Sequence, residues 1–125
     1  MTDAKKTIMI IEDDKFLSSL IKARLEKDGL ITIQAFDGEE AIKELRQQKP
    51  DLIVLDLIMP KVSGFEVLEA ISLDPQMNKI PVVILSNLAQ DSDIQKAKSL
   101  GAVEYFVKVR VSIDDLINKV RTIIG

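Results

Sequence analysis

The chain has 125 residues, of which 46% are hydrophobic and 30% are charged, and its formal net charge is −3. This balance is typical of one soluble globular domain, and the acidic excess argues against direct binding of nucleic acid, which needs a basic surface. The absence of cysteine and histidine excludes disulfides, thiolate nucleophiles, the usual structural zinc sites and both Ser-His and Cys-His catalysis.

The sequence shows no signal for a membrane. The longest apolar runs are a few residues, too short to span a bilayer, and Met1 to Thr7 lack the apolar core of a signal peptide. We therefore expect a cytoplasmic protein without a membrane partner, in which residues 1–125 form a single domain with no output domain.

Five runs typical of strands alternate with five segments typical of helices. The strands are expected at residues 8–11, 31–35, 52–55, 82–85 and 102–107, and the helices begin near residues 15, 38, 64, 91 and 113. Uninterrupted aliphatic runs are typical of strands buried on both faces of a parallel sheet, whereas residues 31–35 alternate and suit an edge strand. The pattern predicts an α/β fold with helices on both faces of the sheet.

Local signals place the helix ends and faces. Asp14 is expected to cap the first helix, and the apolar face of that helix is expected to contain Phe16, Leu17, Leu20, Ile21 and Leu25. Capping-box patterns open three further helices, at Asp37 with Glu40, at Ser63 with Glu66 and at Ser112 with Asp115.

Polar side chains follow four of the five predicted strands at the point where each strand ends. They are Glu12 and Asp13, Asp56, Ser86 and Lys108. Because the carboxyl ends of parallel strands meet at one edge of a sheet, these groups are expected to converge on one shallow cleft.

Carboxylates crowded in this way raise one another's pKa values unless a cation intervenes, and a Mg²⁺-like ion suits an all-oxygen ligand set. A carboxylate such as Asp56 can also attack phosphorus and become an acyl phosphate. Phosphoryl transfer needs a metal and a further cation around the transferred group. The acid pair would hold the metal, and Lys108 would be the further cation.

At these positions the chain resembles the receiver domains of two-component response regulators, of the single-domain chemotaxis type. The resemblance covers nearly everything from Ile8 to Ile124 and rests on four motifs, IIEDD, DLIVLDLIMPKVSGFEVL, PVVILSN and GAVEYFVK. It implies a flavodoxin-like (βα)5 fold whose five-stranded parallel sheet has the order 2-1-3-4-5. It also implies a phosphoacceptor signalling domain that catalyses only its own phosphorylation and slow autodephosphorylation, rather than an enzyme.

The resemblance assigns the acidic residues to phosphorylation and metal binding. Asp56 matches the phosphoacceptor, and Glu12 and Asp13 match the acidic pair that holds Mg²⁺ (or Mn²⁺). Asp13 would bind the metal directly and Glu12 through water, and the backbone carbonyl of Ile58 would complete the protein ligands.

The resemblance also assigns a switch. Ser86 matches the hydroxyl that bonds the phosphoryl group, Lys108 the lysine that pairs with it, and Tyr105 the aromatic that turns inward when Ser86 moves. The implied donor is a phosphohistidine on a sensor histidine kinase or a histidine phosphotransfer protein. The implied output is a separate protein that binds the face built from the helix near residues 91–100, the strand at 102–107 and the last helix.

Several residues depart from the family pattern. Val109 stands where a proline, often cis, usually follows the lysine, and a cis bond before a non-proline residue costs about 2.5–4 kcal/mol, so we expect a trans bond and Lys108 held less firmly or by another route. Asn87 replaces a small residue and would narrow access for a donor. Ile58 and Leu88 flank the expected hydrolytic water and cannot orient it, which predicts a long-lived phosphoryl group.

Alternative functions remain open at this point. A pseudo-receiver that binds partners but takes no phosphate is favoured by the Lys108-Val109 junction and opposed by the complete acid set. A phosphatase of the haloacid-dehalogenase type wants a second acid at position 58, which is isoleucine. A flavodoxin is disfavoured because three acids would repel the phosphate of FMN.

Overall fold

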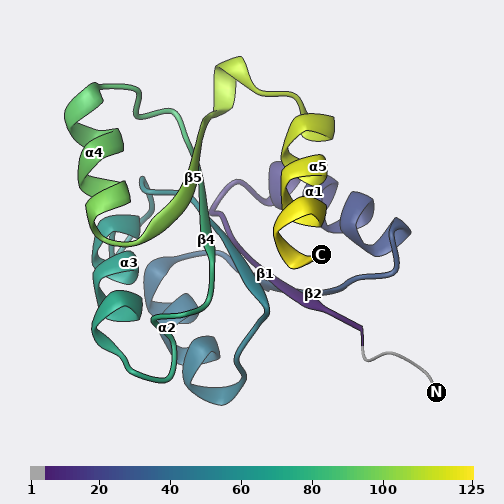
Figure 1. Ribbon diagram of the computed structural model, residues 1–125, viewed down its shortest axis with the longest axis horizontal. Coiled ribbons are helices and arrows are strands. Elements are labelled where there is room, and N and C mark those ends of the chain that lie inside the picture. Colours follow the sequence, from purple (N-terminus) through teal and green to yellow (C-terminus); the bar gives the residue numbers. More distant parts are fainter. Residues whose placement is uncertain (1–4) are drawn as a thin grey trace.

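Residues 5–125 are described by a computed structural model, in which five parallel strands form one sheet with helices on both faces (Figure 1). The strands are β1 (Thr7–Ile11), β2 (Ile31–Ala35), β3 (Leu52–Leu55), β4 (Val82–Ser86) and β5 (Ala102–Val107). The helices are α1 (Lys15–Lys27), α2 (Gly38–Gln47), α3 (Gly64–Leu73), α4 (Asp91–Ser99) and α5 (Ile113–Ile124), and a 3₁₀ turn, η1, covers Lys108–Arg110. The strand order is β2-β1-β3-β4-β5, which confirms the flavodoxin-like α/β fold.

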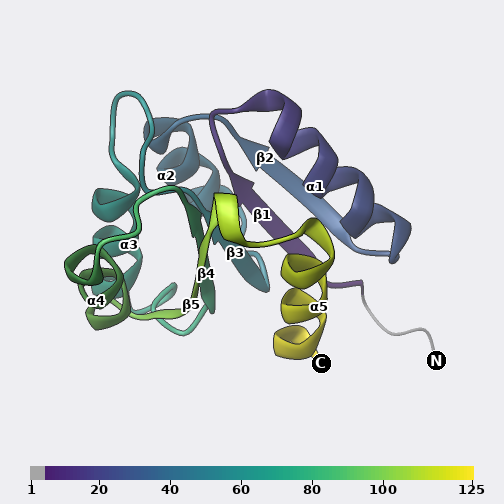
Figure 2. The same cartoon turned by 90° about the horizontal axis from the view of Figure 1, so that it is seen from above.

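The sheet separates two apolar cores because successive side chains of a strand point to opposite faces. Helices α1 and α5 cover one face, and α2, α3 and α4 cover the other (Figure 2). On β1, for example, Ile8 and Ile10 pack with the α1 and α5 side, whereas Met9 and Ile11 pack with the other side. Residues 8–11, 52–55 and 82–85 of the central strands are therefore apolar at every position, as the uninterrupted runs predicted.

The register of the central strands sets the place of the site. Ile11 of β1 pairs with Leu55 of β3, and the Asp56 amide donates to the Ile11 carbonyl at 3.0 Å. The residues that directly follow β1 and β3 therefore lie side by side at the carboxyl edge of the sheet. Strand β2 is an edge strand, as predicted.

The predicted apolar face of α1 is partly wrong. Ile21 and Leu25 are buried, but the side chains of Phe16 and Leu20 are 75% and 41% exposed. The buried stripe runs instead through Ser18, whose hydroxyl accepts a 2.9 Å hydrogen bond from the Gln34 amide group of β2. The helix is rotated so that positions 18, 21 and 25 face the sheet, a rotation that apolar spacing alone did not determine.

The predicted capping boxes are complete at one helix and half formed at two. Ser112 and Asp115 exchange both hydrogen bonds at the start of α5. Asp37 and Ser63 accept the amide hydrogens of Glu40 and Glu66, but no reciprocal glutamate bond forms in the described structure. These caps still fix where α2 and α3 begin, directly beside the site.

Candidate functional site

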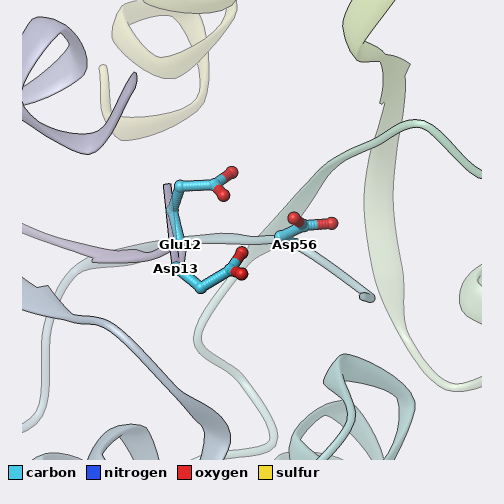
Figure 3. A group of neighbouring side chains, drawn as sticks. All are labelled: Glu12, Asp13 and Asp56. Atoms are coloured by element: carbon cyan, nitrogen blue, oxygen red, sulfur yellow. The ribbon is translucent and has the colours of Figure 1, made fainter. Parts of the chain in front are cut away.

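Three carboxylates predicted from separate strand ends lie together. Glu12 and Asp13 follow β1 and Asp56 follows β3, and one carboxylate oxygen from each of the three lies within 4.8 Å of the others. Figure 3 shows the three side chains gathered around one space at the sheet edge. Oxygen ligands at this spacing fit a hard divalent cation.

The three acids differ in exposure. Glu12 and Asp56 are 2% and 4% exposed, whereas Asp13 lies open to solvent. The fourth acid of the region, Asp14, turns away and caps α1, since its carboxylate accepts the amide hydrogens of Phe16 and Leu17. Asp14 therefore has the capping role expected of it.

Lys108 joins the two buried acids. Its ammonium lies 2.8 Å from Glu12 Oε1 and 2.9 Å from Asp56 Oδ2. No cis peptide bond occurs in residues 5–125, so the Lys108–Val109 bond is trans, as expected. The chain enters turn η1 at Lys108, and the lysine reaches Asp56 without the usual proline.

Burial and pairing shift the pKa values of this ion pair. Burial raises the pKa of Glu12 to about 7, and the charge of Asp56 adds to that rise, while the bond from Lys108 and the Asp14 amide oppose it. Burial alone would lower the pKa of Lys108, but the hydrogen bonds to Glu12 and Asp56 and the charges of these two acids together outweigh burial and raise the pKa. The lysine is therefore a fixed cation beside Asp56.

The backbone after β3 orients the Asp56 carboxylate from the other side. The Ile58 amide donates to Asp56 Oδ1 at 3.2 Å, so the two carboxylate oxygens accept from different partners. Gly64 lies against the Asp56 backbone, where a Cβ would come within 2.1 Å of the Asp56 carbonyl oxygen. This contact leaves no room for a side chain at position 64, so a glycine is required there.

Ser86 and Tyr105 are connected through the peptide groups of Leu88. The Leu88 amide donates to Ser86 Oγ at 3.3 Å, and the Leu88 carbonyl accepts from the Tyr105 hydroxyl at 2.7 Å. Ser86 is fully buried at the end of β4, and burial together with the charges of Asp93 and Asp56 raises the pKa of Tyr105. The two residues predicted to form a switch are thus connected by two hydrogen bonds through Leu88.

Sequence reasoning missed two contributors. The peptide groups of Leu88 connect Ser86 to Tyr105, and no side-chain pattern signals a backbone contact of this kind. Gly38 packs against Val62 of the segment between β3 and α3, and only the position of a glycine just after the Asp37 cap could have suggested such a contact.

Comparisons with known proteins identify the family. A family model described as the response regulator receiver domain matches residues 8–121. The polar-differentiation response regulator DivK of Brucella anthropi is 30% identical over 120 residues, covering 96% of this chain and 97% of DivK. The solved structure of the phosphorylated cyanobacterial phytochrome response regulator RcpA is 36% identical, with a TM-score of 0.83 and coverage of 96% of this chain and 91% of RcpA.

Some relatives are longer. The alkaline phosphatase synthesis transcriptional regulatory protein PhoP of Bacillus subtilis is 37% identical over 103 residues, which are 82% of this chain and 42% of PhoP. The chain thus spans about two fifths of such relatives.

The chain belongs to the response regulator receiver domain family of two-component signalling. Its acidic cluster, Glu12, Asp13 and Asp56, has the oxygen atoms and the spacing to hold a divalent metal ion. Within residues 5–125, no helix has the length and apolarity needed to cross a membrane.

Proposed function

We propose that this receiver accepts a phosphoryl group on Asp56 from a phosphohistidine of a sensor histidine kinase or a histidine phosphotransfer protein. The observation that carries the proposal is the placement of Asp56 between a lysine ammonium at 2.9 Å and two further carboxylates. Phosphoryl transfer depends on positioning and on positive charge around the transferred group. The site has the ammonium group of Lys108 as a fixed cation. Its carboxylates can bind a metal ion as a second cation.

The donor set fits Mg²⁺ or Mn²⁺, because it contains only oxygen atoms and lies at the edge of the sheet. Asp13 is exposed and has no described ion-pair partner, so its carboxylate can ligate directly. Glu12 already accepts from Lys108, which suits a contact through water. The backbone carbonyl of Ile58 would complete the protein ligands, and the metal, when bound, would neutralise charge on the phosphoryl oxygens.

Transfer would form a bond between a carboxylate oxygen of Asp56 and phosphorus while the bond from phosphorus to the donor imidazole breaks. The electron pair of that bond stays with the imidazole nitrogen, and the phosphoryl group takes over the contact of Lys108 with Asp56. The lysine would remain anchored to Glu12 Oε1 at 2.8 Å. This ion pair with Glu12 would hold Lys108 in place although Val109 stands where the family usually has a proline.

A protein donor must cover the rim of the site, because Asp56 is only 4% exposed. Three large apolar side chains lie exposed on elements around it, namely Phe16 at 75%, Ile58 at 53% and Val109 at 81%. Burying such apolar surface against a partner favours association. We assign this rim, Phe16, Ile58 and Val109, to docking of the phosphohistidine protein.

Phosphorylation would act on a partner surface through Ser86. Drawing Ser86 Oγ toward the phosphoryl group breaks its bond with the Leu88 amide, and Leu88 also accepts the Tyr105 hydroxyl. Tyr105 lines a surface groove of about 390 Å³ with residues of α4, β5 and α5, including Ile94, Phe106 and Asp115. A change at Leu88 would therefore alter the α4-β5-α5 face that a separate protein target recognises, by favouring one of two conformations.

The proposal is tested by incubating the protein with Mg²⁺ and phosphoramidate and measuring its intact mass. Wild type should gain one phosphoryl group, and neither Asp56→Asn nor wild type in EDTA should gain any. If no adduct forms and beryllofluoride with Mg²⁺ also fails to bind, the chain is a pseudo-receiver and the proposal is wrong.

A further inference from the structure

Residues 57–63 connect Asp56, at the end of β3, with α3. A hydrogen bond joins the two ends of this segment, and the segment contacts the Asp56 carboxylate. The Gly64 amide donates to the Leu57 carbonyl at 2.9 Å, and the Ile58 amide donates to Asp56 Oδ1 at 3.2 Å. We call this segment the β3–α3 loop. Because Ile58 belongs to it, the position of the loop determines one of the two described contacts on the Asp56 carboxylate.

The flank of the β3–α3 loop packs against the first residue of α2. A Cβ on Gly38 would lie 2.2 Å from the Val62 carbonyl oxygen and 2.7 Å from the Val62 Cβ, whereas carbon atoms in good contact are about 3.5–4.0 Å apart. Gly38 is not among the glycines with positive φ. A glycine is therefore required here by space and not by backbone conformation.

A second contact joins the neighbouring residues. The Lys61 ammonium lies 3.5 Å from Asp37 Oδ2, and Asp37 is the N-cap of α2. Lys61 has φ 67°, a left-handed conformation that a non-glycine residue adopts at a cost. Residues 37–38 and 61–62 thus hold the loop in a conformation that its own sequence disfavours.

We propose that the first turn of α2 positions the phosphoacceptor. Gly38 lets Val62 approach α2, this approach sets the β3–α3 loop, and the loop brings the Ile58 amide to Asp56 Oδ1. The same loop carries the Ile58 carbonyl that is proposed above as a metal ligand. Gly38 is a positioning residue, because the three atoms nearest to its side-chain position all belong to Val62 and not to Asp56 or the proposed metal ligands. The inference rests on the proposed function. It adds that a residue of α2, a helix outside the site, determines the geometry around Asp56.

The test is Gly38→Ala, with Glu39→Ala as the matched control, since Glu39 is exposed on the same turn. The added methyl group would displace Val62 by roughly 1 Å, and misplacements of about 1 Å can cost up to roughly 10²-fold in rate. We expect phosphorylation by phosphoramidate to slow at least tenfold in Gly38→Ala, and Mn²⁺ affinity, measured by electron paramagnetic resonance, to fall severalfold. Glu39→Ala should match wild type in both.

The NMR resonance of the Ile58 amide distinguishes a displaced β3–α3 loop from a general loss of stability. In Gly38→Ala that resonance should shift while far-UV circular dichroism stays that of the wild type. If Gly38→Ala does not fold, Lys61→Gly replaces it, because glycine tolerates the left-handed conformation while the contact with Asp37 is lost. We expect Lys61→Gly to fold and to be phosphorylated severalfold more slowly.

The outcomes distinguish this inference from the proposed function. Failure of the wild type to take phosphate would overturn the proposed function. A wild type that is phosphorylated, with a folded Gly38→Ala or Lys61→Gly of unchanged rate and Mn²⁺ affinity, would overturn the positioning role alone.

Discussion

Replacing Lys108 with methionine removes the ammonium between two buried carboxylates and keeps most of the unbranched side chain. In the wild type that ammonium lies 2.8 Å from Glu12 and 2.9 Å from Asp56, whose side chains are 3% and 4% exposed. The variant leaves both acids without this partner. Lys108 also lines a small cavity with Leu17 and Leu85, and methionine can occupy the same apolar wall.

The expected loss of stability follows from those contacts. A hydrogen bond to a charged group contributes about 1.5–3 kcal/mol, and removing one partner of a buried ion pair costs about 3–5 kcal/mol. Glu12 limits the loss, because the contact with Lys108 lowers the Glu12 pKa, so removing the lysine raises this pKa further and the buried acid takes up a proton more readily. We expect metal-free Lys108→Met to lose about 2–4 kcal/mol of the 5–15 kcal/mol typical of a domain.

Urea unfolding followed by far-UV circular dichroism, in EDTA at mildly alkaline pH, measures this loss. The midpoint should fall by about 1–2 M for an m value of about 2 kcal/mol/M. Lys119→Met is the control, because Lys119 pairs with Glu104 at 3.1 Å on a more exposed surface, and such pairs contribute about 0–1 kcal/mol. The double variant Glu12→Gln/Lys108→Met should recover part of the loss, because it leaves one buried acid fewer.

A Lys108→Met variant no less stable than Lys119→Met would refute the stabilising role of the Lys108 ion pairs. A double variant less stable than Lys108→Met would refute the claim that an unpaired Glu12 causes the loss.

Three further predictions concern the metal, the lifetime and pH. Mg²⁺ at 100 times its Kd should stabilise the wild type by about 2.7 kcal/mol, raising the Tm by several degrees in calorimetry, and Asp13→Asn should reduce that shift. Ile58→Asn should shorten the lifetime of the phosphorylated protein, because a polar side chain can orient the hydrolytic water; an unchanged decay of the phosphorylated mass would contradict this. Glu104→Gln should cost at most about 1 kcal/mol at neutral pH and nothing at strongly acid pH. Burial raises the pKa of Glu104, but the hydrogen bonds from Lys119 and from the Tyr105 amide, together with the charges of nearby lysines, outweigh burial and lower the pKa below 4.5. The stabilisation by Glu104 is therefore present above the unfolded pKa and is lost as the pH falls through the folded pKa. A cost in urea that is as large at strongly acid pH as at neutral pH, or larger, would contradict this.

The elements of this protein could be predicted from the sequence because their causes are local. Aliphatic runs such as residues 52–55 and 82–85 have no polar face. All of their side chains are buried only in a strand that is covered on both faces. Side chains at 12, 56, 86 and 108 end their strands, and parallel strands place such ends at one edge whatever packs around them.

Contacts between distant parts of the chain were decided by the tertiary structure. Apolar spacing marks a stripe on α1 but not its rotation, so Phe16 was placed inside although it lies exposed at the rim. Lys108 follows β5 and Asp56 follows β3, on either side of β4. The sheet therefore brings residues 52 positions apart together, and Lys108 reaches Asp56 and Glu12 although the bond to Val109 is trans.

The sequence by itself determined the alternation of strands and helices, the strand that Asp56 follows and the family, because each depends on periodicity, on caps or on short motifs. The tertiary structure alone decided that Leu88 connects Ser86 to Tyr105 and that Gly38 lies against Val62. Both contacts involve backbone atoms, whose positions follow from how the elements pack and leave little trace in side-chain patterns.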